Sequence, residues 1–160
     1  MRRLAAATLL ACAACGQPER ATSRGVVRTA DSLRAVATEL RVAGTIFTAE
    51  VEAWRSFQPL VGAPGDPLIA VVRVRGEGGA GIPGALAVDS VWLVRGADVV
   101  QGVAREEQPR DRDALTVEFV LRDGPRWPPG DSIDVIVALS GVGAPVPVVR
   151  APRVAIARVD

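Results

Sequence analysis

The chain has 160 residues, of which 49% are apolar, a composition that suits one packed domain with short appendages. It contains no His and no Lys, so all 19 basic residues are Arg. These absences exclude an imidazole base, a His-ligated metal, a serine triad with a His base and a Lys Schiff base. The formal net charge is +1, which gives no electrostatic case for binding nucleic acid.

The first sixteen residues have the order of a secretion leader. Met1–Arg3 is basic, Leu4–Ala11 is apolar, and Cys12 and Cys15 follow among small residues. This start resembles a bacterial lipoprotein signal peptide, in which a peptidase cuts before a Cys whose thiol then receives the lipid. The resemblance implies lipidation at Cys15, which gives the longer leader, or at Cys12, which follows the better-matching residue types. The alternative is an ordinary cleaved leader with incidental cysteines.

The same resemblance implies an exported protein that its lipid holds in the cell envelope. The apolar run is too short to span a membrane. Ala13 or Gly16 follows the modified Cys, where Asp would favour the inner membrane, so we expect the outer membrane, with the protein facing the periplasm or the surface. We therefore assign residues 1–15 to the leader and lipobox, 16–34 to a tether, and 35–160 to the folded domain.

The segment 31–42 fits either a helix or a strand, because its apolar residues satisfy both spacings. We expect a short helix or an irregular lead-in, followed by a strand near Leu40–Val42. A turn at Ala43-Gly44 then leads into a strand over 45–57, in which apolar and polar residues alternate.

Alternating apolar residues predict six further strands, with turn signals between them. Their expected ranges are 68–75, 88–95, 99–104, 115–122, 132–140 and 148–159. Within 115–122 the residues expected to point inward are Leu115, Val117, Phe119 and Leu121, and those expected to point outward are Thr116, Glu118 and Arg122. Trp92 lies at the centre of 88–95, where the pattern leaves open which face is buried. Pro152 inside the last range implies an edge, a bulge or a break.

The stretch from Trp127 to Leu139 combines a tight turn with a strand. Pro128-Pro129-Gly130-Asp131 predicts the turn, and apolar residues then alternate from Ile133 onward. This arrangement resembles the corner before the sixth strand of immunoglobulin-like and fibronectin type III-like domains, although Ile133 stands where those domains usually carry a Tyr. The resemblance implies an all-β fold, an antiparallel immunoglobulin-like sandwich of about seven strands, preceded by the signal peptide and a short tether or helix. A closed barrel is the alternative.

Two stretches resemble binding motifs. Gly76–Gly81 matches G-x-G-x-x-G, but Pro83-Gly84 forbids the helix that a dinucleotide site needs, so we interpret it as a flexible loop. The acids within 105–113 could supply oxygen ligands to calcium, but three interleaved arginines would repel a cation. We interpret this run as a solvated loop.

No catalytic, cofactor-binding or metal-binding residue is predicted, and no cofactor is expected. Trp54, Trp92 and Trp127 are expected to be separate core residues; exposed together, they would form a platform for sugars. The sequence favours a non-catalytic binding or interaction module, with the membrane as one partner and an envelope protein or polysaccharide as the other. One alternative is a structural envelope component that assembles through an edge strand. The other is a carboxylate-dependent glycoside hydrolase acting on envelope polysaccharide.

Overall fold

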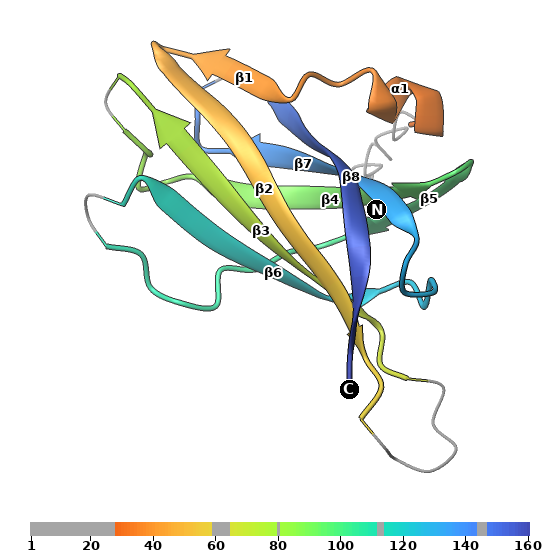
Figure 1. Ribbon diagram of the computed structural model, residues 1–160. Coiled ribbons are helices and arrows are strands. Elements are labelled where there is room, and N and C mark those ends of the chain that lie inside the picture. Colours follow the sequence, from red (N-terminus) through yellow and green to blue (C-terminus); the bar gives the residue numbers. More distant parts are fainter. Residues whose placement is uncertain (1–27, 59–64, 80, 112–113, 144–146) are drawn as a thin grey trace, which may run out of the picture.

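The computed structural model describes residues 28–58, 65–79, 81–111, 114–143 and 147–160 (Figure 1). A single short helix, α1 (Ala30–Arg34), comes first among them. The strands that follow are β1 (Glu39–Val42), β2 (Thr45–Ser56), β3 (Leu68–Glu77), β4 (Ala87–Arg95), β5 (Asp98–Gly102), β6 (Thr116–Gly124), β7 (Ser132–Ser140) and β8 (Val148–Val159). The chain is therefore all-β, as predicted. Both candidate lipidation sites, Cys15 and Cys12, lie outside the described residues.

The segment 31–42, whose sequence fitted either a helix or a strand, contains most of α1 and all of β1. Thr29 caps α1, because its hydroxyl accepts a hydrogen bond from the Ser32 N–H at 3.2 Å. Leu33 of this helix is fully buried, so α1 belongs to the packed structure even though the sequence placed residues 16–34 in the tether. β1 then forms a hairpin with β2 through Ala43 and Gly44, both of which have positive φ.

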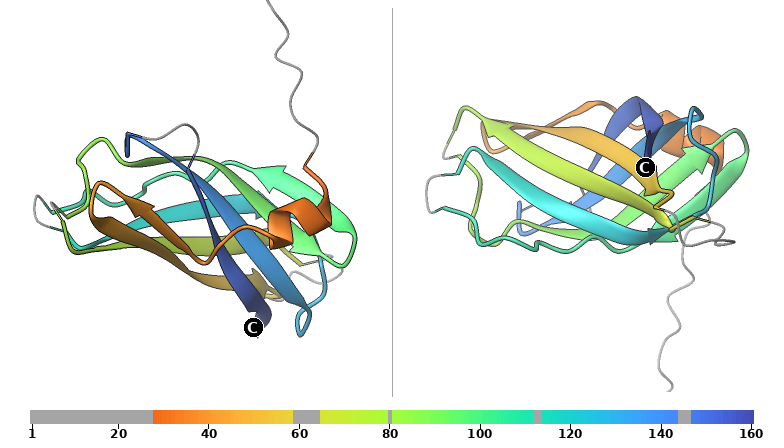
Figure 2. Two further views of the ribbon diagram at one scale, coloured as in Figure 1. Left: turned by 90° about the horizontal axis from the view of Figure 1, so that it is seen from above. Right: turned by 60° about the horizontal axis from the view of Figure 1, so that its bottom comes forward.

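The strands form one hydrogen-bonded sheet in the order β5-β4-β7-β8-β2-β3-β6, with β1 also paired to β2. The sheet curls, so that the half containing β1, β2, β3 and β6 lies over the half containing β4, β5, β7 and β8 (Figure 2). All pairs are antiparallel except β2 and β8, which run parallel where 53–56 meets 156–159. The sequence predicted a purely antiparallel arrangement of about seven strands. The structure corrects this to a mixed sheet of eight, because β8 joins the two halves.

The main core lies between the two halves of the sheet. It draws on both, and its fully or almost fully buried members include Phe47, Leu68, Val72, Val91, Leu93, Phe119, Val135 and Val137. Burying each such side chain stabilises the fold by about 1.5–3 kcal/mol relative to leaving it in water.

β4 is buried on both faces, which answers the question that its sequence left open. Val91 and Leu93 face the main core, whereas Trp92 and Val94 form a second cluster with Leu33 of α1. The run is continuously apolar because one face meets the opposite half of the sheet and the other is covered by α1.

One inward assignment was wrong. Leu115 lies one residue before β6, and its side chain is 62% exposed. Its carbonyl still accepts a hydrogen bond from the Gly76 N–H at 3.0 Å. The other three inward residues, Val117, Phe119 and Leu121, are each 2% exposed, as predicted.

Pro152 lies at a bulge in β8, one of the three outcomes that its sequence position allowed. Ile133 pairs with Val154 and Val135 pairs with Ala151, so β8 carries one extra residue between these pairs. Arg153 has a φ of 54°, in the left-handed region. Bulges bend the strand that carries them, and this one lies where β8 turns from β7 toward β2.

Candidate functional site

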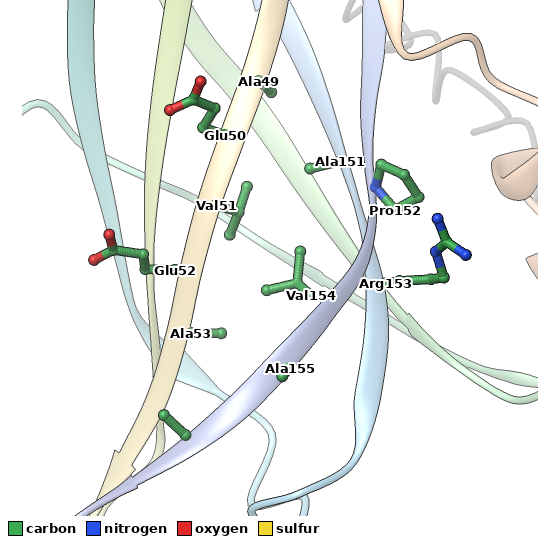
Figure 3. Close-up of a pocket in the computed structure, with 11 residues that line it drawn as sticks. Ala49, Glu50, Val51, Glu52, Ala53, Ala151, Pro152, Arg153, Val154 and Ala155 are labelled. Carbon is green, nitrogen blue, oxygen red and sulfur yellow. The ribbon is translucent and has the colours of Figure 1, made fainter.

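β2 and β8 join the two halves of the sheet along only part of their length. β1 covers the edge of β2 over residues 45–48, and β8 covers it over 53–56. Residues 49–52 of β2 therefore have a strand partner only on the β3 side. Because β8 diverges from β2 beside these residues, an opening remains between them (Figure 3).

We call this opening the window. Its volume is about 500 Å³, and it is lined by Ala49, Glu50, Val51, Glu52, Ala53, Ala151, Pro152, Arg153, Val154, Ala155 and Ala157. Five of these residues are Ala, so short side chains leave the space open. A cavity of this size can admit a short ligand segment.

The edge of β2 presents backbone groups to the window. The N–H of Phe57 points toward β8, where it donates to the Val159 carbonyl at 2.8 Å. Peptide groups alternate in direction along a strand, and the register of β2 with β3 runs without a shift from Ile46 to Trp54. The N–H and C=O groups of Ala49 and Val51 therefore point into the window, where no described strand pairs with them.

The edge of β8 is less suited to pairing. Pro152 has no N–H to donate, and the bulge at Arg153 interrupts the regular backbone direction. Both features are common devices that keep an edge strand from pairing with another chain. The window therefore has one edge that can accept a strand, on β2, and one blunted edge, on β8.

The floor of the window is apolar and its rim is charged. Ala49, Val51 and Val154 pack against the main core, and Val51 and Val154 point toward one another in Figure 3. Glu50 and Glu52 alternate with them on the outer face of β2 and are exposed. The side chain of Arg153 points away from β2.

The carboxylates of the rim share a single arginine. Arg73 of β3 lies directly opposite Glu50 in the register, yet its guanidinium pairs with Glu52 at 2.9 Å and with Glu118 of β6 at 3.1 Å. The hydrogen bond that Arg73 donates to Glu52, followed by the charges of both acids, raises the pKa of Arg73. Glu50 forms no ion pair with any described residue. Arg75 and Glu77 of β3 lie on the same face, where they pair with each other at 3.3 Å.

The connection from α1 to β1 lies against β8 at Arg150, the residue before Ala151 of the window. Its backbone is tied to β8, because Arg150 donates from its N–H to the Ala37 carbonyl at 3.0 Å and from Nε to the Val36 carbonyl at 3.0 Å. Asp134 of β7 accepts from Arg150 at 3.2 Å and from Arg34 of α1 at 3.1 Å. These arginines partly cover Asp134, whose side chain is 15% exposed.

The two motif-like stretches have structural roles. Gly76 belongs to β3 and Gly78 and Gly79 form a turn, so no helix begins at the glycine run in its described part. In the charged loop, Glu106 pairs with Arg110 and Glu107 pairs with Arg122. Hydrogen bonds from these arginines lower the pKa of both carboxyls, whereas a glycosidase acid needs a raised pKa. Asp113 lies outside the described residues, and the rest of the described chain brings together no set of three potential metal ligands.

The three tryptophans lie apart. Trp127 is buried in the main core with Arg95 stacked 5.0 Å from its ring, Trp92 is buried beneath α1, and Trp54 is half-buried on the outer face of β2. Trp92 and Trp127 are core residues, as predicted, whereas Trp54 is not, and the three form no common platform for a sugar.

Sequence reasoning missed the window. The alternation of Ala and Val with Glu in 49–53 was visible, as were the small residues and Pro152 of 151–157. Their closeness, however, depends on a pairing between the first long strand and the last. No helix within the described ranges has the length and apolar character needed to cross a bilayer. Comparison of the chain with family models, with curated proteins and with solved structures finds no match.

Proposed function

We propose that the protein is a lipid-anchored component of the cell envelope whose domain is a non-catalytic interaction module, and that it binds a partner by strand addition at the window. The observation that carries this proposal is the uncovered edge of β2 over residues 49–52, which lies above an apolar floor. Strand addition uses such edges, because the main chain supplies affinity and alternate side-chain positions supply specificity.

We also propose that the domain is an immunoglobulin-like sandwich. Reading β2, β3, β4, β5, β6, β7 and β8 as strands A, B, C, C′, E, F and G accounts for the two halves of the sheet. The order β5-β4-β7-β8 then corresponds to C′-C-F-G, and β2-β3-β6 corresponds to A-B-E. The turn before β7 supports the same reading, since that strand follows the corner from which the resemblance came.

Lipidation at Cys15, or at Cys12, supplies the anchor in this proposal. The support is the basic start, the apolar run and the small residues beside both cysteines. The lipid would hold the module at the outer membrane, where an envelope protein could reach the window. Glu50 and Glu52 line the window, but its lining residues include no aromatic side chain on which a sugar could stack, so the interaction module is favoured over the glycosidase alternative.

Site-specific photocrosslinking in the cells that make the protein tests this function. A photoreactive residue replaces Ala155, which is exposed beside the window, or Ala87, which is exposed on β4 in the other half of the sheet. We expect a discrete protein adduct from position 155 and none from position 87, together with a diacylglycerol mass on the mature N-terminus. Equal adducts from both positions, or none from position 155, would contradict a docking role for the window. An unmodified N-terminus would contradict the anchor.

A further inference from the structure

The chemistry of the window also defines its occupant. We infer that it accepts an extended peptide segment of a partner protein in which small apolar residues alternate with Arg or Lys. This inference rests on the proposed function and adds the identity of the side chains that the window selects.

The first step concerns the backbone. Residues 49–52 leave room for about one short strand segment, and the groups of Ala49 and Val51 that face the window can pair with it. The proline and the bulge of β8 prevent regular pairing on the opposite edge. The segment therefore extends the half of the sheet that contains β2, and its own side chains alternate between the core side and the outer side.

The second step concerns the side chains that point inward. They would meet Ala49, Val51 and Val154, which already contact the main core. The volume of about 500 Å³ must hold the backbone of the segment as well as these side chains. Small apolar residues such as Ala and Val fit this requirement, whereas a charged residue would be desolvated there with no described partner to pair with it.

The third step concerns the side chains that point outward. The strand position beside β2 places them next to Glu50 and Glu52, on a face where Arg73 pairs with Glu52 and Glu118, and Arg75 pairs with Glu77. Opposite charges on neighbouring strands stabilise a pair, and like charges directly opposite destabilise it. Glu50 has no ion-pair partner in the described chain, so a Lys or Arg of the incoming segment can form an ion pair with it.

Peptide binding to the mature lipidated protein in nanodiscs of zwitterionic lipid tests the inference. The probes are a fluorescent seven-residue peptide that alternates Ala with Arg, the same peptide with Glu in place of Arg, and an Arg peptide with N-methyl groups on the edge that would pair with β2. We expect the Arg peptide to bind with saturation. The Glu peptide should bind at least tenfold more weakly, and N-methylation should remove binding without a change in charge.

Two charge-reversal variants make the test specific. Glu50→Arg should weaken binding of the Arg peptide at least tenfold and strengthen binding of the Glu peptide. Asp89→Arg changes the net charge by the same amount at an exposed position on β4 and should change neither affinity by more than about twofold. Circular dichroism and the denaturation midpoint of each variant show that it remains folded.

Several outcomes would overturn the inference: equal binding of the Arg and Glu peptides, equal effects of the two variants, or undiminished binding of the N-methylated peptide. If no alternating peptide binds while crosslinks from position 155 persist in cells, the occupant chemistry is wrong and the docking function stands. If the crosslinks are also absent, both proposals fail.

Discussion

Phe119 lies in the main core, and the neighbouring Glu118 lies on the outer face of β6. Truncating Phe119 to Ala should lower the free energy of unfolding by about 3–5 kcal/mol, because it removes buried apolar surface and leaves a cavity. Glu118→Ala loses only a half-exposed ion pair with Arg73 and should cost at most about 1 kcal/mol. Denaturant midpoints measure both variants, and similar losses would contradict the alternation of the strand.

Asp134 holds α1 and the connection to β1 through Arg34 and Arg150. We expect Asp134→Asn to lower stability by about 1–3 kcal/mol, because two partly covered guanidinium groups lose their carboxylate. Amide exchange at Leu33 and Ala35 should accelerate in the same variant. Asp98→Asn is the matched control, since its pair with Arg95 is 61% exposed on the aspartate side and should contribute less than about 1 kcal/mol. Unchanged exchange in the Asp134 variant would exclude this anchoring role.

Protonation of Glu106 should account for part of the stability that the domain loses in acid. Its pKa is lowered in the folded state by the hydrogen bond from Arg110, so its contribution to stability is present above the unfolded pKa of about 4.3 and is lost as the pH falls through the folded value. We expect Glu106→Gln to be at most about 1 kcal/mol less stable at pH 7 and to converge with the unaltered protein once the pH has fallen below the folded pKa. Urea unfolding across this range is the measurement. A difference that stays constant with pH would refute the assignment.

At the scale of elements, the backbone at Gly141, just after β7, packs closely against the connection from β3 to β4. Gly141 and Gly143 both have positive φ, but a Cβ at Gly141 would overlap the carbonyl of Ala85, whereas one at Gly143 meets open space. Gly143→Ala should therefore cost only the backbone strain, about 1–2 kcal/mol, and Gly141→Ala should cost clearly more. Thermal unfolding of the two variants separates the close contact from the strain. Equal losses would mean that the two loops do not contact each other as described.

Strand positions were largely predictable from the sequence because alternation is local. The ranges predicted for 132–140 and 148–159 coincide with β7 and β8, and Pro152 correctly marked an irregularity. The inward assignment of Leu115 was wrong, because the apolar pattern extends one residue before the start of β6, to a position whose side chain is exposed. The ion pairs of Asp134 could not be predicted from a local pattern, since its partners Arg34 and Arg150 are distant in the chain.

At the scale of the whole molecule, the window is a consequence of topology. It exists because β1 and β8 cover different parts of the edge of β2 and leave four residues between them. The hairpin of β1 with β2 follows from the local turn at Ala43 and Gly44, but the pairing with β8 does not, since β8 lies about a hundred residues further along the chain. The charges and small side chains of the window were therefore visible in the sequence, but their assembly into one site was not.

Amide hydrogen exchange at Ala49 and Val51 tests the central claim most directly, because the uncovered edge of β2 is the feature on which the proposed function depends. In the free protein we expect these two amides to exchange rapidly, while those of Val72 and Val74 in the adjoining core strand are protected. Adding the alternating Arg peptide should slow exchange at Ala49 and Val51. Strong protection of both amides in the free protein would show that the edge is already covered, and would contradict the account.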